Sequence, residues 1–139
     1  MKVLDLPLTK NLHIQVTKHG PYLLEMVHHP HLLNHLETIH GSASYALAEI
    51  SSGYFLNTEF RDIADQTIPI LRESRVKYRL AGEGNLYSKV VLVGMTDEEV
   101  RKKLLARKKI ILTLQVRLYN EENKIVLSAE FDWFITLST

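Results

Sequence analysis

The sequence predicts an α+β fold in which a curved antiparallel β-sheet wraps around one long central helix, at about residues 41–56. The segment 41–58 is rich in small and apolar residues and carries one charged side chain, Glu49, which is typical of a buried helix. Most of the remaining sequence consists of apolar runs separated by turn residues, as in antiparallel strands. Such strands with one apolar helix on a face form a two-layer domain.

The strands are predicted from their periodicity and from the turns between them. Leu12, Ile14 and Val16 alternate with polar residues, and turn signals at 81–85 and 120–123 indicate hairpins. The expected strands cover residues 12–18, 74–80, 86–93, 110–119 and 124–137. The short apolar run that follows the first strand, residues 22–27, fits either a strand or a helix.

Composition narrows the class of protein. Of the 139 residues, 45% are hydrophobic and 24% are charged, which fits a single globular domain over residues 1–139. A formal net charge of +1 argues against nucleic-acid binding, which usually needs a strong basic excess. There is no cysteine, which excludes disulfides, thiolate metal sites and a cysteine nucleophile, and which suits the cytoplasm.

Neither the N-terminus nor the predicted helix has the pattern of a membrane segment. The first ten residues place Asp5, Pro7 and Lys10 where a signal peptide has its apolar core. The segment 41–58 contains Glu49 and four serines, which makes it too polar for a membrane span. We therefore expect a cytoplasmic protein with no membrane partner.

Glu49 is the first candidate for chemistry, because it is a carboxylate in a helix that is predicted to be protected from water. Burial raises the pKa of a carboxyl group unless the charge is paired or hydrogen-bonded. A raised pKa suits a general base or a nucleophile. Glu49 could instead reach the edge of the helix or form an ion pair with Arg75 or Arg79, and the residues alone leave both interpretations open.

Gly41, at the predicted start of the helix, is the second candidate. A glycine there lets a ligand approach the backbone, and first-turn amides can bind an anion or a polarised carbonyl oxygen. His40 and Glu49 are nine residues apart, which corresponds to about 13 Å along a helix axis. We therefore expect the two ends of this site to meet only when two copies of the chain share it, as in a symmetric dimer.

The same residues form a motif that resembles one in a known family. Asn34 is followed after five residues by His40-Gly41-Ser42-Ala43, and then by Leu47-Ala48-Glu49. This is similar to the hotdog-fold acyl-CoA thioesterases of the phenylacetate-pathway and 4-hydroxybenzoyl-CoA types, in which an asparagine precedes His-Gly-Gly and an acidic residue follows the histidine by nine positions. It also resembles less characterised bacterial hotdog proteins. The resemblance covers the strand–helix core and, more loosely, the hairpin-rich remainder.

The resemblance implies the hotdog fold and a role for each matching residue. Glu49 would be the general base or nucleophile that attacks a thioester, and the Gly41 amide would bind the thioester oxygen. Asn34 would help to place the water or the carbonyl, whereas His40 would support the turn rather than act as a base. The Glu49 and Gly41 of one site would come from different subunits of a homodimer, which could assemble further into a homotetramer. No cofactor is implied apart from the coenzyme A of the substrate.

Two departures from the family pattern leave a second function open. Ser42 stands where the family has its second glycine, and 81–84 replaces a Pro-Gly turn. The alternative is a hotdog domain that binds an acyl-CoA or a lipid-like ligand without hydrolysing it. A hotdog dehydratase fits less well, because His40 lies in a different motif. The expected substrate-binding residues are Ser42, Tyr45, Arg75 and Arg79.

The histidines suggest one further kind of site. All seven precede residue 41, and a turn of helix after Pro30 would place His31 and His35 on one face at a zinc-binding spacing, with Glu37 as a weak third ligand. We expect no metal site, because exposed loop histidines are the commoner case and a metal needs three or four ligands.

The last features concern a short helix and the aromatic residues. Thr96 and Glu99 form a capping box for a helix that ends near Arg107. Six basic residues lie within 101–109; they fit a solvated helix end, or alternatively a patch for the phosphates of coenzyme A. The aromatic residues of the central helix are expected to fill the core rather than to line an acyl tunnel; these are Tyr45, Tyr54 and Phe55.

Overall fold

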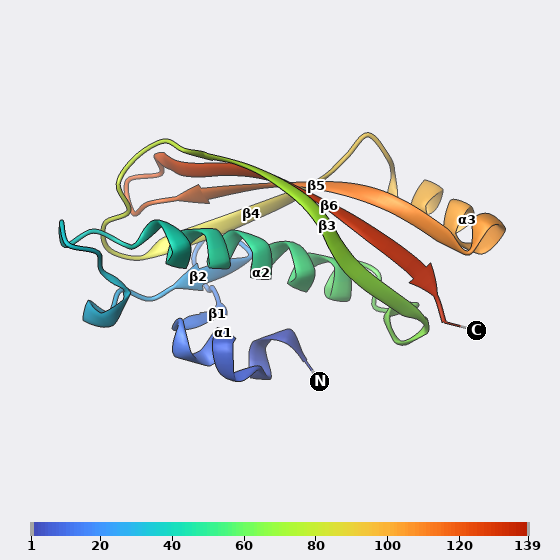
Figure 1. Ribbon diagram of the computed structural model, residues 1–139, viewed down its shortest axis with the longest axis horizontal. Helices are drawn as coiled ribbons and strands as arrows, with labels where there is room; N and C mark the ends of the chain where they lie inside the picture. Colours follow the sequence, from blue (N-terminus) through green and yellow to red (C-terminus); the bar gives the residue numbers. More distant parts are fainter. Residues whose placement is uncertain (1, 139) are drawn as a thin grey trace.

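Six strands form one antiparallel sheet that curves around the long helix α2 in the computed structural model, which describes residues 2–138 (Figure 1). The strands are β1 (Ile14–Val16), β2 (Leu24–Met26), β3 (Thr67–Tyr78), β4 (Leu86–Val93), β5 (Lys109–Tyr119) and β6 (Ile125–Leu137). Their order in the sheet is β1-β2-β4-β5-β6-β3. A sheet wrapped around one helix confirms the predicted hotdog fold.

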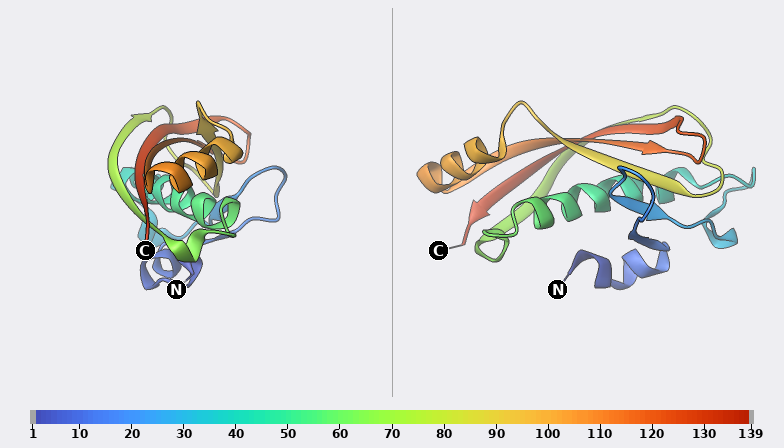
Figure 2. Two further views of the ribbon diagram at one scale, coloured as in Figure 1. Left: turned by 90° about the vertical axis from the view of Figure 1, so that its right-hand side faces the viewer. Right: turned by 180° about the vertical axis from the view of Figure 1, so that it is seen from behind.

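Three α-helices and three short 3-10 helices complete the fold. They are η1 (Val3–Asp5), α1 (Pro7–Asn11), η2 (Pro30–Leu32), α2 (Gly41–Glu59), η3 (Ala64–Gln66) and α3 (Asp97–Arg107). The N-terminal pair η1 and α1 lies on the side of α2 that faces away from the sheet, whereas α3 lies beyond the C-terminal end of α2 (Figure 2). Within residues 2–138, we find no helix with the length and apolarity needed to cross a membrane.

Helix α2 extends three residues beyond the predicted end at about residue 56. Gly53 does not break it; a Cβ at this position would lie 3.7 Å from the Trp133 ring, so the helix runs close to β6 here. Thr58 does not end it either, since its hydroxyl donates to the Tyr54 carbonyl one turn back. Buried apolar residues occur on opposite sides of the helix, such as Ala48 and Ile50, which are about 160° apart around its axis, so its composition is apolar nearly all round.

The core lies between α2 and the concave face of the sheet. On β5 the even-numbered residues, from Ile110 to Leu118, are buried, and the odd-numbered ones face outwards. The predicted capping box starts α3, where the backbone N–H of Glu99 donates to the Thr96 hydroxyl. The hairpin predicted at 120–123 also joins two paired strands, β5 and β6.

The hairpin predicted at 81–85 is wrong, because β3 and β4 are not neighbours. Strand β3 pairs with β6 and forms one edge of the sheet, while β4 lies between β2 and β5. The connection crosses the end of the sheet and forms a bridge between Gly82 and Ile39. A Cβ on Gly82 would lie 3.0 Å from the Cβ of Ile39, so this glycine serves close backbone approach to the segment before α2.

The first and third strands differ from the predicted ranges. Strand β1 covers three residues because His13 has a left-handed backbone (φ 57°), which ends the extended conformation on that side. Val16, which the alternation predicts to be buried, is 50% exposed. Strand β3 begins at Thr67, seven residues before the expected start. Ile68 and Ile70 face outwards in this part of the strand, so the sequence lacks the alternation of buried apolar and exposed polar residues that predicts a strand.

Candidate functional site

The start of α2 presents one unpaired backbone amide. The His40 ring caps the helix: its Nδ1 accepts from the backbone N–H of Ser42 at 3.1 Å, and the Ser42 hydroxyl lies 2.7 Å from the same nitrogen. The N–H groups of Ala43 and Ser44 donate to the His40 carbonyl. Within residues 2–138, the Gly41 N–H has no hydrogen-bond partner, which leaves it available to an external acceptor.

The Gly41 backbone opens into a surface pocket. Two chain segments form its walls, the loop before α2 and the crossing that follows β3; the lining residues are Asn34, Leu36, Thr38, Ile39, Gly41, Ser44, Tyr78, Arg79, Leu80, Ala81, Gly82 and Val126. Asn34 and Arg79 bring polar groups to the same pocket as Gly41. The helix start and the end of β3 lie close together here, because a Cβ on Gly41 would be in van der Waals contact with the Tyr78 ring, at 3.4 Å.

Asn34 lines this pocket, but its carboxamide is largely engaged by its own loop. The side-chain oxygen accepts from the backbone N–H groups of Leu36 (2.9 Å) and Thr38 (3.1 Å). Its nitrogen donates to the Thr38 hydroxyl at 3.0 Å. These bonds fix the loop as a compact turn, so in this structure Asn34 shapes the wall of the pocket through the backbone that it holds.

Ser42 lies on the other side of the helix start. It lines a separate pocket with His31, His40 and Ala46, and both its amide and its hydroxyl are engaged by the His40 ring. A second free amide, of the kind that two successive glycines could offer, is therefore not present beside that of Gly41.

Glu49 lies two turns further along α2, on the helix face that is turned towards β3 and β6. The residues four positions before and after it mark this face, since they share its row: Tyr45 bonds to Ser74 of β3 at 2.8 Å, and a Cβ on Gly53 would lie 3.7 Å from the Trp133 ring of β6. Strand β3 is the sheet edge. The carboxylate is therefore directed towards the edge of the wrapped sheet rather than into its centre.

The Glu49 side chain is half-buried and unpaired. Burial raises its pKa above the ordinary value of a glutamate. Within the described chain the carboxylate takes part in no ion pair and no side-chain hydrogen bond. The turn that carries it is nevertheless fixed, because the Trp133 indole N–H donates to the Ser52 hydroxyl (3.0 Å), which donates to the Glu49 carbonyl (2.7 Å).

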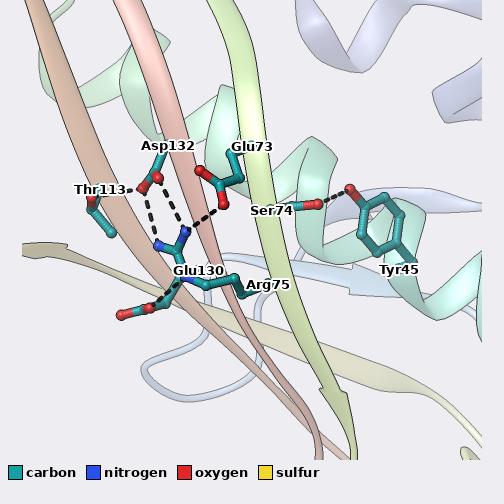
Figure 3. Close-up of polar contacts among 7 residues, drawn as sticks. All are labelled: Tyr45, Glu73, Ser74, Arg75, Thr113, Glu130 and Asp132. Carbon is teal, nitrogen blue, oxygen red and sulfur yellow. Dashed lines mark hydrogen bonds and ion pairs between the residues drawn. The ribbon is translucent and has the colours of Figure 1, made fainter.

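The interpretation in which Arg75 or Arg79 neutralises Glu49 is wrong within one subunit. Neighbouring strand residues point to opposite faces, so Arg75 lies on the outer face of the sheet while Ser74 reaches inwards to Tyr45 (Figure 3). Arg75 binds Asp132 with two nitrogens at 3.1 and 3.2 Å, and Arg79 donates to the Ser128 hydroxyl.

Arg75 has a full set of carboxylate partners on that outer face. Besides Asp132 it contacts Glu130 at 3.2 Å and Glu73 at 3.5 Å. This arrangement raises the pKa of Arg75, and together with the Thr113 hydroxyl it lowers the pKa of Asp132 (Figure 3). Of the two arginines expected to bind substrate, only Arg79 lines the pocket beside Gly41; the role itself stays a prediction for both.

The two halves of the predicted site do not meet within one subunit. Gly41 and Glu49 are eight residues apart on a continuous helix, which separates their backbones by about 12 Å. The basic run 101–109 lies at the opposite end of α2 from Gly41 (Figure 1), and Arg101 is bound there to Asp62 at 2.9 Å. In one subunit this run is therefore remote from the pocket.

Tyr45 contributes to the core and to the position of β3. Its ring meets the buried Phe131 edge-on, with centroids 5.8 Å apart, and its hydroxyl is bonded to Ser74. Tyr54, two turns later and also half-buried, lines a different cavity together with Lys2 and Arg61.

The histidine pair His31 and His35 does not have the spacing considered for zinc. Helix η2 ends at Leu32 and Leu33 is extended, so the two histidines do not share a helix face.

Comparison with known proteins places the chain in a family and a fold. One family model, described as "Domain of unknown function (DUF4442)", matches residues 5–135. No curated protein matches in sequence. A crystal structure from Pseudomonas aeruginosa, described as a protein of unknown function and probable thioesterase, superposes with a TM-score of 0.83 at 17% identity, over 97% of this chain and 91% of that one.

Two further solved structures are similar. A Bacillus halodurans protein with CoA has a TM-score of 0.71 at 16% identity, over 92% of this chain and 74% of that one. The E. coli PaaI protein from the phenylacetic acid degradation operon has a TM-score of 0.72 at 13% identity, over 97% of this chain and 89% of that one. Structural similarity at these sequence identities shows the fold alone. The family is shown separately by the sequence match over residues 5–135. The chain therefore belongs to the DUF4442 family and has the hotdog fold.

Proposed function

We propose that the protein hydrolyses acyl-CoA thioesters, and that Glu49 is the essential carboxylate. The observation that carries the proposal is Glu49 itself: a carboxylate with a raised pKa and no partner in its own subunit, on an otherwise uncharged stretch of a core helix. An unpaired, partly desolvated charge has an energetic cost. Its position beside an open sheet edge is suited to proton transfer or nucleophilic attack on a bound substrate.

The Gly41 amide would supply the second requirement of thioester hydrolysis. When Glu49 takes a proton from water, hydroxide adds to the thioester carbon and negative charge develops on the former carbonyl oxygen. A donor aimed at that oxygen stabilises the charge, and Gly41 N–H is unpaired at a helix start. Collapse then breaks the carbon–sulfur bond, and the leaving thiolate takes the proton from Glu49. In the alternative, Glu49 attacks the carbon directly and water hydrolyses the resulting anhydride.

A shared site in a homodimer would bring the two groups together. The 12-residue strand β3 forms an edge of the sheet, with Glu49 directed towards it. Long edge strands present unpaired backbone groups that a second copy can pair with. Symmetric pairing would carry the Gly41 pocket of one copy towards the Glu49 of the other. The proposed CoA ligand is supported by the similar Bacillus halodurans structure, which contains CoA.

The test is the turnover of a panel of acyl-CoA thioesters by the wild type and by Glu49→Gln, followed as release of free thiol. The substitution keeps size and removes the base, so we expect kcat to fall by about 10²- to 10⁴-fold. Glu98→Gln is the matched control, since Glu98 is exposed on α3. Unchanged hydrolysis in Glu49→Gln, with the wild type active, would overturn the proposal.

One observation favours the alternative, a domain that binds acyl-CoA without hydrolysing it. Ser42 occupies the position of the second glycine in the thioesterases whose motif this chain resembles. Its amide is engaged by His40, so among the described residues at the start of α2 the Gly41 amide alone remains for the thioester oxygen. Acyl-CoA binding by the wild type with no release of thiol across the panel would support this binding role.

A further inference from the structure

Three histidines that are separated in the sequence gather beside the start of α2. One ring nitrogen from each of His13, His29 and His31 lies within 4.8 Å of the other two. The ring centroids are 4.0 Å apart for His29 and His31, 4.4 Å for His13 and His29, and 4.9 Å for His13 and His31. We call this group the three-histidine cluster.

The fold assembles the cluster through the β1–β2 hairpin. Ile14 lies opposite Met26 in this hairpin, and the backbone N–H of Val27 donates to the His13 carbonyl at 2.9 Å. This register brings His13 next to the segment that leads to His29. His13 has a left-handed backbone, with φ 57°, a conformation that is uncommon for residues other than glycine. Strand β1 therefore begins directly after His13, whose ring contacts those of His29 and His31.

The contacts of His31 match those of a metal ligand. Its Nε2 lies 3.1 Å from the Asn11 carbonyl, so this nitrogen carries the proton and donates. The proton on Nε2 leaves Nδ1 with a free lone pair. Histidines that bind metals almost always donate their other ring N–H to a carbonyl or a carboxylate in this way.

His29 brings a ring nitrogen to the cluster from the residue that caps η2. Its Nδ1 accepts a long contact, 3.3 Å, from the backbone N–H of His31. A metal at Nδ1 would replace that contact, and a metal at Nε2 would require the proton to sit on Nδ1. Either nitrogen of a neutral ring can be the ligand.

We propose that the three-histidine cluster binds one divalent transition-metal ion of the zinc class through three imidazole nitrogens. Tetrahedral zinc with Zn–N bonds of 2.0–2.1 Å needs its nitrogens about 3.3 Å apart. The three nitrogens now lie within 4.8 Å of one another, so each would have to move by at most about 1 Å to reach that distance. Three imidazoles leave a fourth position for water. The nitrogen-only set also suits Co²⁺, Ni²⁺ and Cu²⁺.

The ion would add a link between the end of α1 and η2, which the His31 ring already joins through its bond to the Asn11 carbonyl. His13 follows α1, whereas His29 and His31 belong to η2 and its cap. His31 also lines one pocket together with His40, the cap of α2. A metal here would fix the N-terminal helix against the segment that leads into the start of α2. This role is independent of the hydrolysis proposed above.

The test uses untagged full-length protein, freed of metal with a chelator and titrated with Co²⁺, whose visible absorption reports tetrahedral nitrogen coordination. We expect saturation at about one ion per chain, displacement by Zn²⁺, and an increase in Tm when Zn²⁺ is added, because an ion that binds only the folded state stabilises it. Absence of the absorption band and of any increase in Tm would overturn the proposal.

Two variants separate the cluster from incidental binding at the surface. His29→Asn keeps a side chain that can cap η2, and His13→Asn keeps a residue that tolerates the left-handed backbone. Each should weaken Zn²⁺ binding at least about tenfold, the lower end of the loss seen for residues that support a metal site. His35→Asn is the matched control, since His35 is exposed outside the cluster. Equal binding by all three variants would contradict the assignment.

Discussion

The two halves of the candidate site are built in opposite ways. The Gly41 half is a short polar loop in which nearly every group is used: the Asn34 carboxamide makes four contacts inside its own turn, and the His40 ring caps the helix. Among the described residues of this half, the Gly41 backbone N–H is left without a hydrogen-bond partner. The Glu49 half is a carboxylate with no polar partner in its subunit, carried on a turn that Trp133 and Ser52 hold in place.

This difference indicates which half depends on something outside the subunit. The Gly41 pocket is formed within one chain, mainly by segments 34–41 and 78–82. Glu49 lies on the helix face next to the sheet edge, where a second subunit or a substrate would complete its surroundings. In the proposed function, the first half would bind the thioester oxygen without rearrangement, and the second would be a reactive carboxylate whose environment a second subunit completes.

The largest effect that distinguishes the two halves should come from removing the free amide of the Gly41 half. Gly41→Pro deletes the N–H with little cost to the helix, because proline is favoured at the first helical position and His40 already has the extended backbone (ψ 136°) that a following proline requires. We expect kcat for acyl-CoA hydrolysis to fall about 10²- to 10³-fold, the loss typical of one oxyanion donor.

Gly41→Ala is the matched control for this substitution. It keeps the N–H, and its Cβ would meet the Tyr78 ring at 3.4 Å, a distance at which a small shift suffices. Turnover should therefore remain close to that of the wild type. An equal loss of kcat in both variants, or a loss in Gly41→Pro confined to KM, would contradict the role of the amide.

A smaller effect tests whether the halves meet across two subunits. When Glu49→Gln and Gly41→Pro chains are co-expressed, each mixed dimer contains one site with an intact Glu49 from one chain and an intact Gly41 from the other. Random pairing makes half of the dimers mixed, so about a quarter of wild-type turnover should return. Co-expression of Glu49→Gln with the double variant leaves no intact site and is the control. No recovery in the first mixture would show that each site lies within one subunit.

The sequence predicts what is local in the fold and misses what is not. The central helix, the capping box at Thr96 and the hairpin at 120–123 depend on residues that are close in the chain. The position of β3 depends on pairing with β6, about sixty residues away, and its outward-facing Ile68 and Ile70 obscure its period. The sequence of the crossing at Gly82 resembles a hairpin turn because it contains glycine. In the structure this glycine instead allows close packing against Ile39.

The same distinction applies to the sites. Glu49 and Gly41 could be singled out because an isolated charge and a helix-start glycine are visible in the sequence. The surroundings of Arg75 could not, since strand alternation turns it towards Asp132 on the outer face. His13 was missed although a signal existed: pairing the first two strands about Gly20 places His13 opposite Val27, close to His29.

The smallest effect concerns stability and follows from the raised pKa of Glu49. Between the pKa of the unfolded chain, about 4.3, and the higher pKa of the folded protein, the folded state binds more protons, so the free energy of unfolding falls as pH rises. Above the folded pKa the cost of the charge is complete. Glu49→Gln removes that cost and should raise the free energy of unfolding at neutral pH by about 0.5–1 kcal/mol, with no gain at pH 4.

Urea unfolding at neutral pH and at pH 4 measures this difference, with Glu83→Gln, on an exposed turn, as the control. A destabilised Glu49→Gln at neutral pH would mean that the charge is satisfied in the folded protein, and that the two halves of the site are alike after all.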